Sequence, residues 1–232
     1  MTRSFFAKEL EELHIDMIKM GSLVEESIEN TIEALRNQDV ELAKNIYESD
    51  DIIDSYEKKI ERQCLNLIAR QQPLAKDLRA ISTALKIITD MERIADHSAD
   101  IAEITIRMAD EKYIKPLIDI PKMANLARQM VNKAIDAYVN NDLELARKVC
   151  QSDDEVDDLF YKIVLELTNI IKNDVSTTEQ AVNFMFIAKY LERMADHATN
   201  IAEWVVYNIT GENEKFAKYY HKDDKARKPF EK

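Results

Sequence analysis

A stretch of twelve residues, Glu92–Glu103, recurs one hundred positions later as Glu192–Glu203, with eight of the twelve positions identical. The identical positions include Glu, Arg, Asp and His, which packing in a protein core would not select. Further matches occur at an offset of 103 and pair residues 39–43 with 142–146, and 49–54 with 152–157. A chain that repeats its pattern in this way is expected to fold as two similar halves.

Only two glycines and four prolines interrupt the 232 residues, so the repeat is expected to be helical. Apolar residues recur every three or four positions over residues 5–36, which predicts a first long helix. Gly21 lies inside it and is expected to weaken it by about 1 kcal/mol relative to alanine. Asp39 is a favourable N-cap for a second helix, Pro73 predicts a turn after it, and a third helix is expected to reach about Asp110.

Residues 112–121 contain two prolines and predict the linker between the halves. After it the helical pattern repeats, and Gly211 predicts the end of the last helix. We therefore predict an all-α fold of six long helices in two pseudo-symmetric antiparallel three-helix bundles. The predicted divisions are a first bundle over residues 1–112, a second over residues 113–211 and a charged C-terminal tail over residues 212–232.

Charge and cysteine content narrow the class of protein. The 44 acidic residues outnumber the 32 basic ones, which gives a net charge of −12 and argues against nucleic acid or anionic lipid as the main partner. Cys64 and Cys150 lie far apart and are expected to be reduced thiols. No apolar signal segment occurs, and no run approaches the ~18 apolar residues of a membrane helix, so a soluble cytoplasmic protein is expected.

Two glutamates occupy positions where the helical pattern calls for an apolar residue. Glu92 lies on the inward seam of the predicted third helix, and Glu192 has the same place in the second half. A carboxylate in such a position loses several kcal/mol to desolvation unless it is paired or binds a metal ion. The seam glutamates are therefore candidate site residues.

Further carboxylates are expected to face these glutamates. In two antiparallel helices, residues at equal distances from the turn lie at the same height. Counting outward from Pro73 pairs Asp50 with Asp96, and Asp54 with Glu92, at equal heights along the two helices. Around the turn at residues 173–176 it gives Asp153 with Asp196, and Asp157 with Glu192. The sequence thus predicts four carboxylates at one height in each bundle.

Four neighbouring negative charges repel one another, and a hard cation with oxygen ligands would relieve that repulsion. The alternative is that these acids form ordinary contacts along a solvated helix surface, such as Asp54 with Lys58 and Arg93 with Asp96. His97 and His197 follow the acidic pairs by one residue and are expected to be polar neighbours or supporting donors rather than ligands. No glycine-rich phosphate loop or nucleophile elbow occurs, so no catalytic site and no enzyme activity are expected.

Two three-helix repeats, each with a DxxxD on the second helix and an ERxADH motif on the third, resemble the PhoU family of bacterial phosphate-signalling regulators. The resemblance covers about residues 5–211. It implies an accessory protein of phosphate uptake that couples the ATPase subunit of a Pst-type ABC transporter to the sensor histidine kinase of a two-component system. Such a protein represses the phosphate-starvation response when phosphate is plentiful, often as a homodimer, and reaches the membrane only through its partners.

The resemblance also implies metal sites, because some family members bind iron or other metal clusters at these motifs. The ion here would be iron or another divalent or trivalent ion such as zinc, manganese or magnesium. Carried over by position, the ligands would be Asp50, Asp54, Glu92, Asp96 and Asp100 in the first half, and Asp153, Asp157, Glu192 and Asp196 in the second. The counterpart of Asp100 is Asn200, which argues against equal metal content at the two sites.

Two other functions fit parts of the sequence. A carboxylate-bridged di-iron oxidase would also be a helical bundle, but its sites use Glu-x-x-His, whereas His97 lies five residues after Glu92. A purely structural helical scaffold without a link to phosphate would tolerate neutralisation of all the acidic pairs. Metal analysis and the phenotype of the acidic variants distinguish these possibilities.

Overall fold

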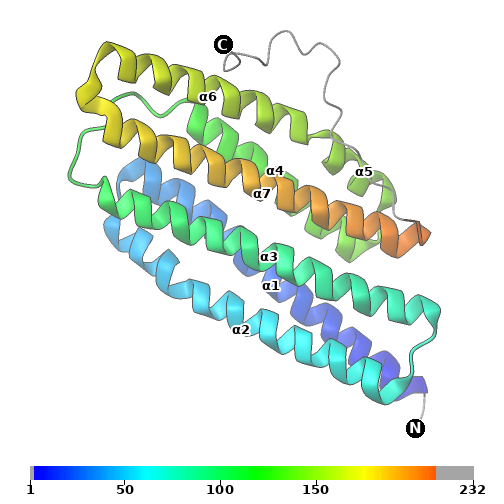
Figure 1. The fold of residues 1–232 in the computed structure, drawn as a ribbon. Coiled ribbons are helices and arrows are strands. Elements are labelled where there is room, and N and C mark those ends of the chain that lie inside the picture. Colours follow the sequence, from blue (N-terminus) through cyan, green and yellow to red (C-terminus); the bar gives the residue numbers. More distant parts are fainter. Residues whose placement is uncertain (1–2, 213–232) are drawn as a thin grey trace.

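The computed structural model describes residues 3–212, and long helices make up nearly all of them (Figure 1). The first half contains α1 (Arg3–Asn37), α2 (Val40–Gln71) and α3 (Ala75–Arg107). The second contains α4 (Asp119–Asn140), α5 (Leu143–Gln151), α6 (Asp153–Asn173), a 3-10 turn η1 (Val175–Thr177) and α7 (Thr178–Thr210). No strand occurs between residues 3 and 212, which confirms the all-α prediction with three antiparallel helical rods in each half.

The second helix of the first half, α2, is continuous, whereas the corresponding part of the second half is interrupted at Ser152 and forms α5 and α6. There the Ser152 amide donates to the carbonyl of Val149 at 2.9 Å, a tighter turn than that of an α-helix. The next three residues are acidic and favour a new helix N-terminus, so α6 begins at Asp153. This interruption was not predicted, because the matching residue Ser49 and its similar neighbours lie inside the continuous helix α2.

Both middle rods begin with the same local chemistry. The side chain of Asp39 accepts from the amide of Leu42 at 3.0 Å, as predicted, and that of Asp142 accepts from the amide of Leu145 at 2.9 Å. The preceding turns also match, because Gln38 and Asn141 both adopt left-handed backbone conformations. The duplication therefore extends to backbone detail.

The two halves pack on each other through α3 against α7 and α1 against α4, and both pairs are antiparallel (Figure 1). One continuous apolar core spans the halves and includes Met17, Met91 and Phe184. Gly21 lies where α1 approaches α4 closely. A Cβ at this position would lie 3.0 Å from the side chain of Ile135, so the glycine permits this contact in addition to weakening the helix locally.

The linker between α3 and α4 is anchored to both halves. The Gln180 side chain accepts from the amide of Ile114 at 2.5 Å, and the Tyr113 hydroxyl donates to the carbonyl of Leu35 at 2.7 Å. The division of the chain at residue 112 stays a prediction. The predicted tail over residues 212–232 lies outside the described residues except for Glu212.

Candidate functional site

The carboxylates of the first half come from α2 and α3, which pack side by side. The predicted register of the two helices is supported by a neighbouring pair at equal distances from Pro73: the Thr89 hydroxyl lies 3.5 Å from a carboxylate oxygen of Glu57. Asp54 lies one turn before Glu57 on α2, and Glu92 lies one turn after Thr89 on α3. The acidic pairs therefore face the groove between these two helices.

Electrostatics show that these carboxylates lie close enough to repel one another. Burial, together with the negative charges of Asp96 and Asp54, raises the pKa of Asp50 to about 6. Burial likewise raises the pKa of Glu92 to about 7, with a second contribution from Asp96. The pKa of Asp100 is also raised, by burial and by Glu103. Full ionisation of the predicted cluster near neutral pH is therefore unfavourable.

Basic side chains compensate this charge only in part. Arg93 donates from Nη1 to Asp96 at 3.0 Å, and its Nε lies 3.4 Å from Glu92. Lys58 pairs with Asp54 at 3.1 Å. The pairs Arg93 with Asp96 and Lys58 with Asp54 are the ordinary helix-surface contacts that the sequence suggested as the alternative, and they coexist with the raised pKa values of Asp50 and Glu92.

The second half keeps the four carboxylates but adds a cation among them. Lys189 donates to Glu192 at 2.5 Å, and its ammonium group also lies 5.4 Å from the ring centre of Phe160. The counterparts of Lys189 and Phe160 in the first half are Thr89 and Glu57. A lysine and a phenyl ring thus replace a hydroxyl and a carboxylate, which makes the second site less negative.

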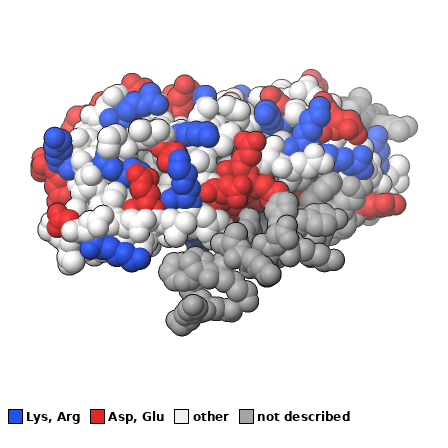
Figure 2. Space-filling model, turned by 90° about the horizontal axis from the view of Figure 1, so that it is seen from above, with Lys and Arg blue, Asp and Glu red and all other residues white. Residues whose placement is uncertain are grey.

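The second half nevertheless remains acidic at its surface. The first turn of α6 contains Asp153, which is buried, and the exposed residues Asp154 and Glu155. Figure 2 shows the face of the molecule that lies uppermost in Figure 1, where α6 runs. On this face acidic side chains gather in one dense group, whereas basic side chains are spread out. The side chain of Glu192 is 12% exposed and that of Lys189 is 41% exposed, so their ion pair remains partly accessible to water.

No three His, Cys, Asp or Glu side chains within residues 3–212 are arranged so that they could hold a metal ion. The structure brings the first-half carboxylates within mutual electrostatic range without assembling them into a coordination cluster. Their donor chemistry, carboxylate oxygens in excess, fits a hard cation. The assignment of the nine predicted acidic residues as ligands therefore stays a prediction.

The two motif histidines meet between the halves, where α3 crosses α7. The ring centres of His97 and His197 are 5.7 Å apart. His197 Nδ1 lies 2.8 Å from a carboxylate oxygen of Asp90, and the ring of His97 stacks on Tyr190 at 5.3 Å. Burial lowers the pKa of His97 to about 4, assisted by His197 and Arg193, so this imidazole is neutral at pH 7.

Several residues that shape the site were missed by the sequence analysis. Counting equal distances from the two turns would have placed Glu57 beside Thr89 and Phe160 beside Lys189. Counting within one half could not have predicted the contact of Asp90, because its partner His197 lies in the other half. The packing of α3 on α7 creates that contact.

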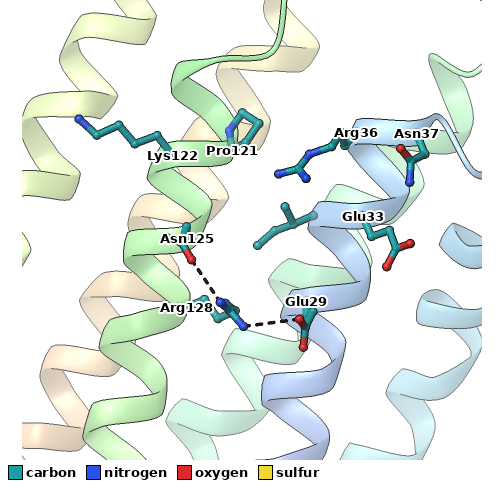
Figure 3. Close-up of a pocket in the computed structure, with 9 residues that line it drawn as sticks. Glu29, Glu33, Arg36, Asn37, Pro121, Lys122, Asn125 and Arg128 are labelled. Carbon is teal, nitrogen blue, oxygen red and sulfur yellow. Dashed lines mark hydrogen bonds and ion pairs between the residues drawn. The ribbon is translucent and has the colours of Figure 1, made fainter.

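A separate pocket of about 500 Å³ lies between the C-terminal end of α1 and the N-terminal end of α4 (Figure 3). Within it Arg128 lies 3.7 Å from Glu29 and 3.2 Å from Asn125. Arg36 extends from α1 toward α4 (Figure 3). This pocket contains none of the repeated acidic motifs.

Fold and motifs define a class of duplicated helical bundle with paired acidic motifs in each half. The family model for the PhoU domain matches this chain twice, over residues 17–105 and 120–205. The chain belongs to the PhoU family. None of the helices in the described part of the chain combines the length and apolar character needed to cross a membrane.

Similar proteins span almost the whole chain. A phosphate-specific transport system accessory protein PhoU homolog of Clostridium acetobutylicum is 45% identical over 91% of this chain and 97% of its own. The homolog of Aquifex aeolicus is 40% identical over 94% of this chain and 98% of its own length. The crystal structure of PhoU from Pseudomonas aeruginosa superposes with a TM-score of 0.87 at 33% identity, over 89% of this chain and all of that one.

Proposed function

We propose that this protein is an accessory and regulatory component of phosphate-specific transport. The observation that carries the proposal is the 45% identity to a protein of that name over 97% of the length of that protein. A match of this extent includes both repeats and both sets of acidic motifs. The activity is therefore ascribed to the whole duplicated bundle rather than to one half.

Its action is that of a non-enzymatic cytoplasmic adaptor. The partners are the ATPase subunit of a phosphate ABC transporter and the sensor histidine kinase of the phosphate two-component system, and the protein acts as a homodimer. Contact with the transporter at high phosphate favours the inactive state of the kinase, which requires different affinities for the two kinase states. The rigid, shared core supports such a role, because it presents both halves as one body.

Metal binding is proposed for the acidic sites, with the first half as the stronger one. Asp50, Asp54, Glu92 and Asp96 would hold iron or another divalent or trivalent ion, which would supply positive charge to this cluster. Their mutual repulsion supports the proposal, since the pKa values of Asp50 and Glu92 are raised. In the second half Lys189 already supplies a cation to Glu192.

The regulatory role is tested by deleting the gene and measuring a phosphate-starvation promoter in phosphate-rich medium. Derepression that the intact gene reverses is expected, and unchanged expression contradicts the proposal. The adaptor role is tested by affinity purification from detergent-solubilised membranes at high and low phosphate. Recovery of the transporter ATPase and the kinase is expected, with a ratio that depends on phosphate.

The acidic sites are tested in the same strain with a variant in which Asp50, Asp54 and Asp96 become Asn and Glu92 becomes Gln. The matched control carries the same four changes at Asp153, Asp157, Asp196 and Glu192. Full repression by both variants, in folded and stable form, would assign the acidic pairs to structure alone. Loss of repression by either variant supports a functional role for that half.

A further inference from the structure

The arginines and histidines of the two repeated motifs have no part in the proposed metal sites, yet the structure brings them together. They line an open pocket of about 640 Å³ between α3 and α7. Its lining consists of Arg93, His97, Arg193, Asp196, His197 and Asn200. Five of these six side chains can donate hydrogen bonds, and only Asp196 is acidic.

The two arginines differ in what they already bind. Arg93 is held by Glu92 and Asp96 on its own helix. Arg193 is exposed, and within residues 3–212 its guanidinium has no carboxylate within ion-pair distance. In a chain with 44 acidic residues, an arginine at the junction of two helices without such a partner has its full set of donors available.

The carboxylates around the pocket are largely engaged. One oxygen of Asp90 accepts from His197, as above, and also from the side-chain amide of Asn200 at 3.1 Å. Asp96 accepts from Arg93. Within the described residues Arg193 forms no ion pair of its own, although Asp100 lies close enough to interact with it electrostatically.

We propose that this pocket binds a phosphoryl oxyanion, either inorganic phosphate or the phosphate group of a nucleotide, with Arg193 as the principal ligand. A guanidinium presents two parallel N–H donors that match two oxygens of a tetrahedral anion. Arg93 and Asn200 line the same pocket from opposite halves, so the bound anion contacts both α3 and α7. One lining residue, Asp196, is also a predicted ligand of the second-half metal site, whereas the inference does not depend on the proposed partners.

The test is isothermal titration of the full chain, prepared free of metal so that phosphate cannot bind to a bound cation. Inorganic phosphate and ADP are titrated separately at constant ionic strength, because the surrounding acids make the interaction sensitive to salt. Saturable binding with a Kd of about 1 mM or below is expected for at least one of them. The ligand that binds identifies the source of the phosphoryl group.

Three variants separate a specific site from general charge attraction. Arg193→Gln is expected to weaken binding at least about tenfold, and Asp196→Asn to tighten it several-fold by removing the one acidic group of the lining. Arg36→Gln is the matched control, since it removes another exposed arginine that does not line this pocket and is expected to leave Kd within about twofold. Circular dichroism and Tm verify that each variant is folded.

The proposal is overturned if neither ligand shows saturable binding up to about 10 mM. It is also overturned if Arg193→Gln and Arg36→Gln weaken binding equally, because the effect would then come from net charge. The pocket is established as the binding site if binding is saturable, if Arg193→Gln alone weakens it and if Asp196→Asn strengthens it.

Discussion

The two halves of this protein share their helices, turns and acidic motifs but differ in how those acids are compensated. In the first half, Glu57 adds a further carboxylate beside the cluster, and Glu92 has a raised pKa. In the second half, Phe160 occupies the position of Glu57, and Lys189 contacts Glu192 directly. The difference teaches that a duplicated backbone fixes where the carboxylates lie, whereas two or three neighbouring side chains decide how their charge is compensated.

The largest expected effect concerns metal content. Neutralising Asp50, Asp54, Glu92 and Asp96 together is expected to lower metal affinity of the first half by about 100-fold or more, because each ligand contributes on the order of 1 kcal/mol. Elemental analysis and titration of chelator-free protein measure the change. The matched second-half variant is expected to lose less metal; equal losses would show that Lys189 does not distinguish the sites.

The second effect is a pH dependence of stability in the metal-free protein. Asp50 and Glu92 hold their protons more tightly in the folded protein, with pKa values of about 6 and 7, than in the unfolded chain. Their ionisation therefore opposes folding, and the free energy of unfolding should fall by about 1–3 kcal/mol as pH rises from 5 to 8.

Urea unfolding at the two pH values measures this loss. Glu92→Gln should remove part of it, while Glu41→Gln, at an exposed carboxylate paired with Lys44, serves as the control. A pH slope that Glu92→Gln leaves unchanged would contradict the assignment.

A third effect, no larger than the second, is expected at a duplicated ion pair between the first and second helices of each half. Asp16 pairs with Lys59 and Asp119 with Lys162, each at 2.8 Å, and the two pairs are related by the offset of 103. Burial raises the pKa of Asp16, but hydrogen bonds from Lys59 and Gln63 outweigh it and lower the pKa overall.

Asp16→Ala should therefore destabilise the protein by about 1–3 kcal/mol, and Asp119→Ala by less, since only Asp16 has the additional bond from Gln63 at 2.9 Å. Thermal unfolding measures both changes. An equal loss of Tm in the two variants would show that the pairs are equivalent despite their different surroundings.

The smallest effect comes from exchanging the residue that distinguishes the two sites. Lys189→Thr gives the second half the side chain of the first and should raise its cation affinity about three- to fivefold, because an accessible charge is worth less than about 1 kcal/mol. Thr89→Lys should lower the affinity of the first half by a similar factor. Titration of each single variant with the same metal ion measures the exchange, and an unchanged ratio between the sites would rule out this lysine as the cause.

Most of the fold could be predicted because it depends on local patterns. Helix lengths follow from apolar periodicity, and the start of the second rod follows from Asp39, which forms the predicted cap. The register of α2 and α3 follows from the position of Pro73. The break at Ser152 could not be foreseen, because its local sequence closely matches that of the continuous helix α2.

The candidate site was predicted less completely than the fold. The facing of carboxylates within one half is a matter of counting along two helices, and the structure places the first-half acids within electrostatic range. Contacts between halves depend on how α3 crosses α7, which no sequence period encodes. For this reason the meeting of His97 with His197 became visible only in the structure.

The antiparallel contact of α3 with α7 also limits how the two copies can diverge in evolution. Asp90 and Tyr190 are duplicates of each other that have changed, and each now supports the motif histidine of the opposite copy. A substitution at either position therefore changes the surroundings of a histidine in the other repeat. The two halves are coupled through these contacts, so the effect of a substitution in one half extends to the other.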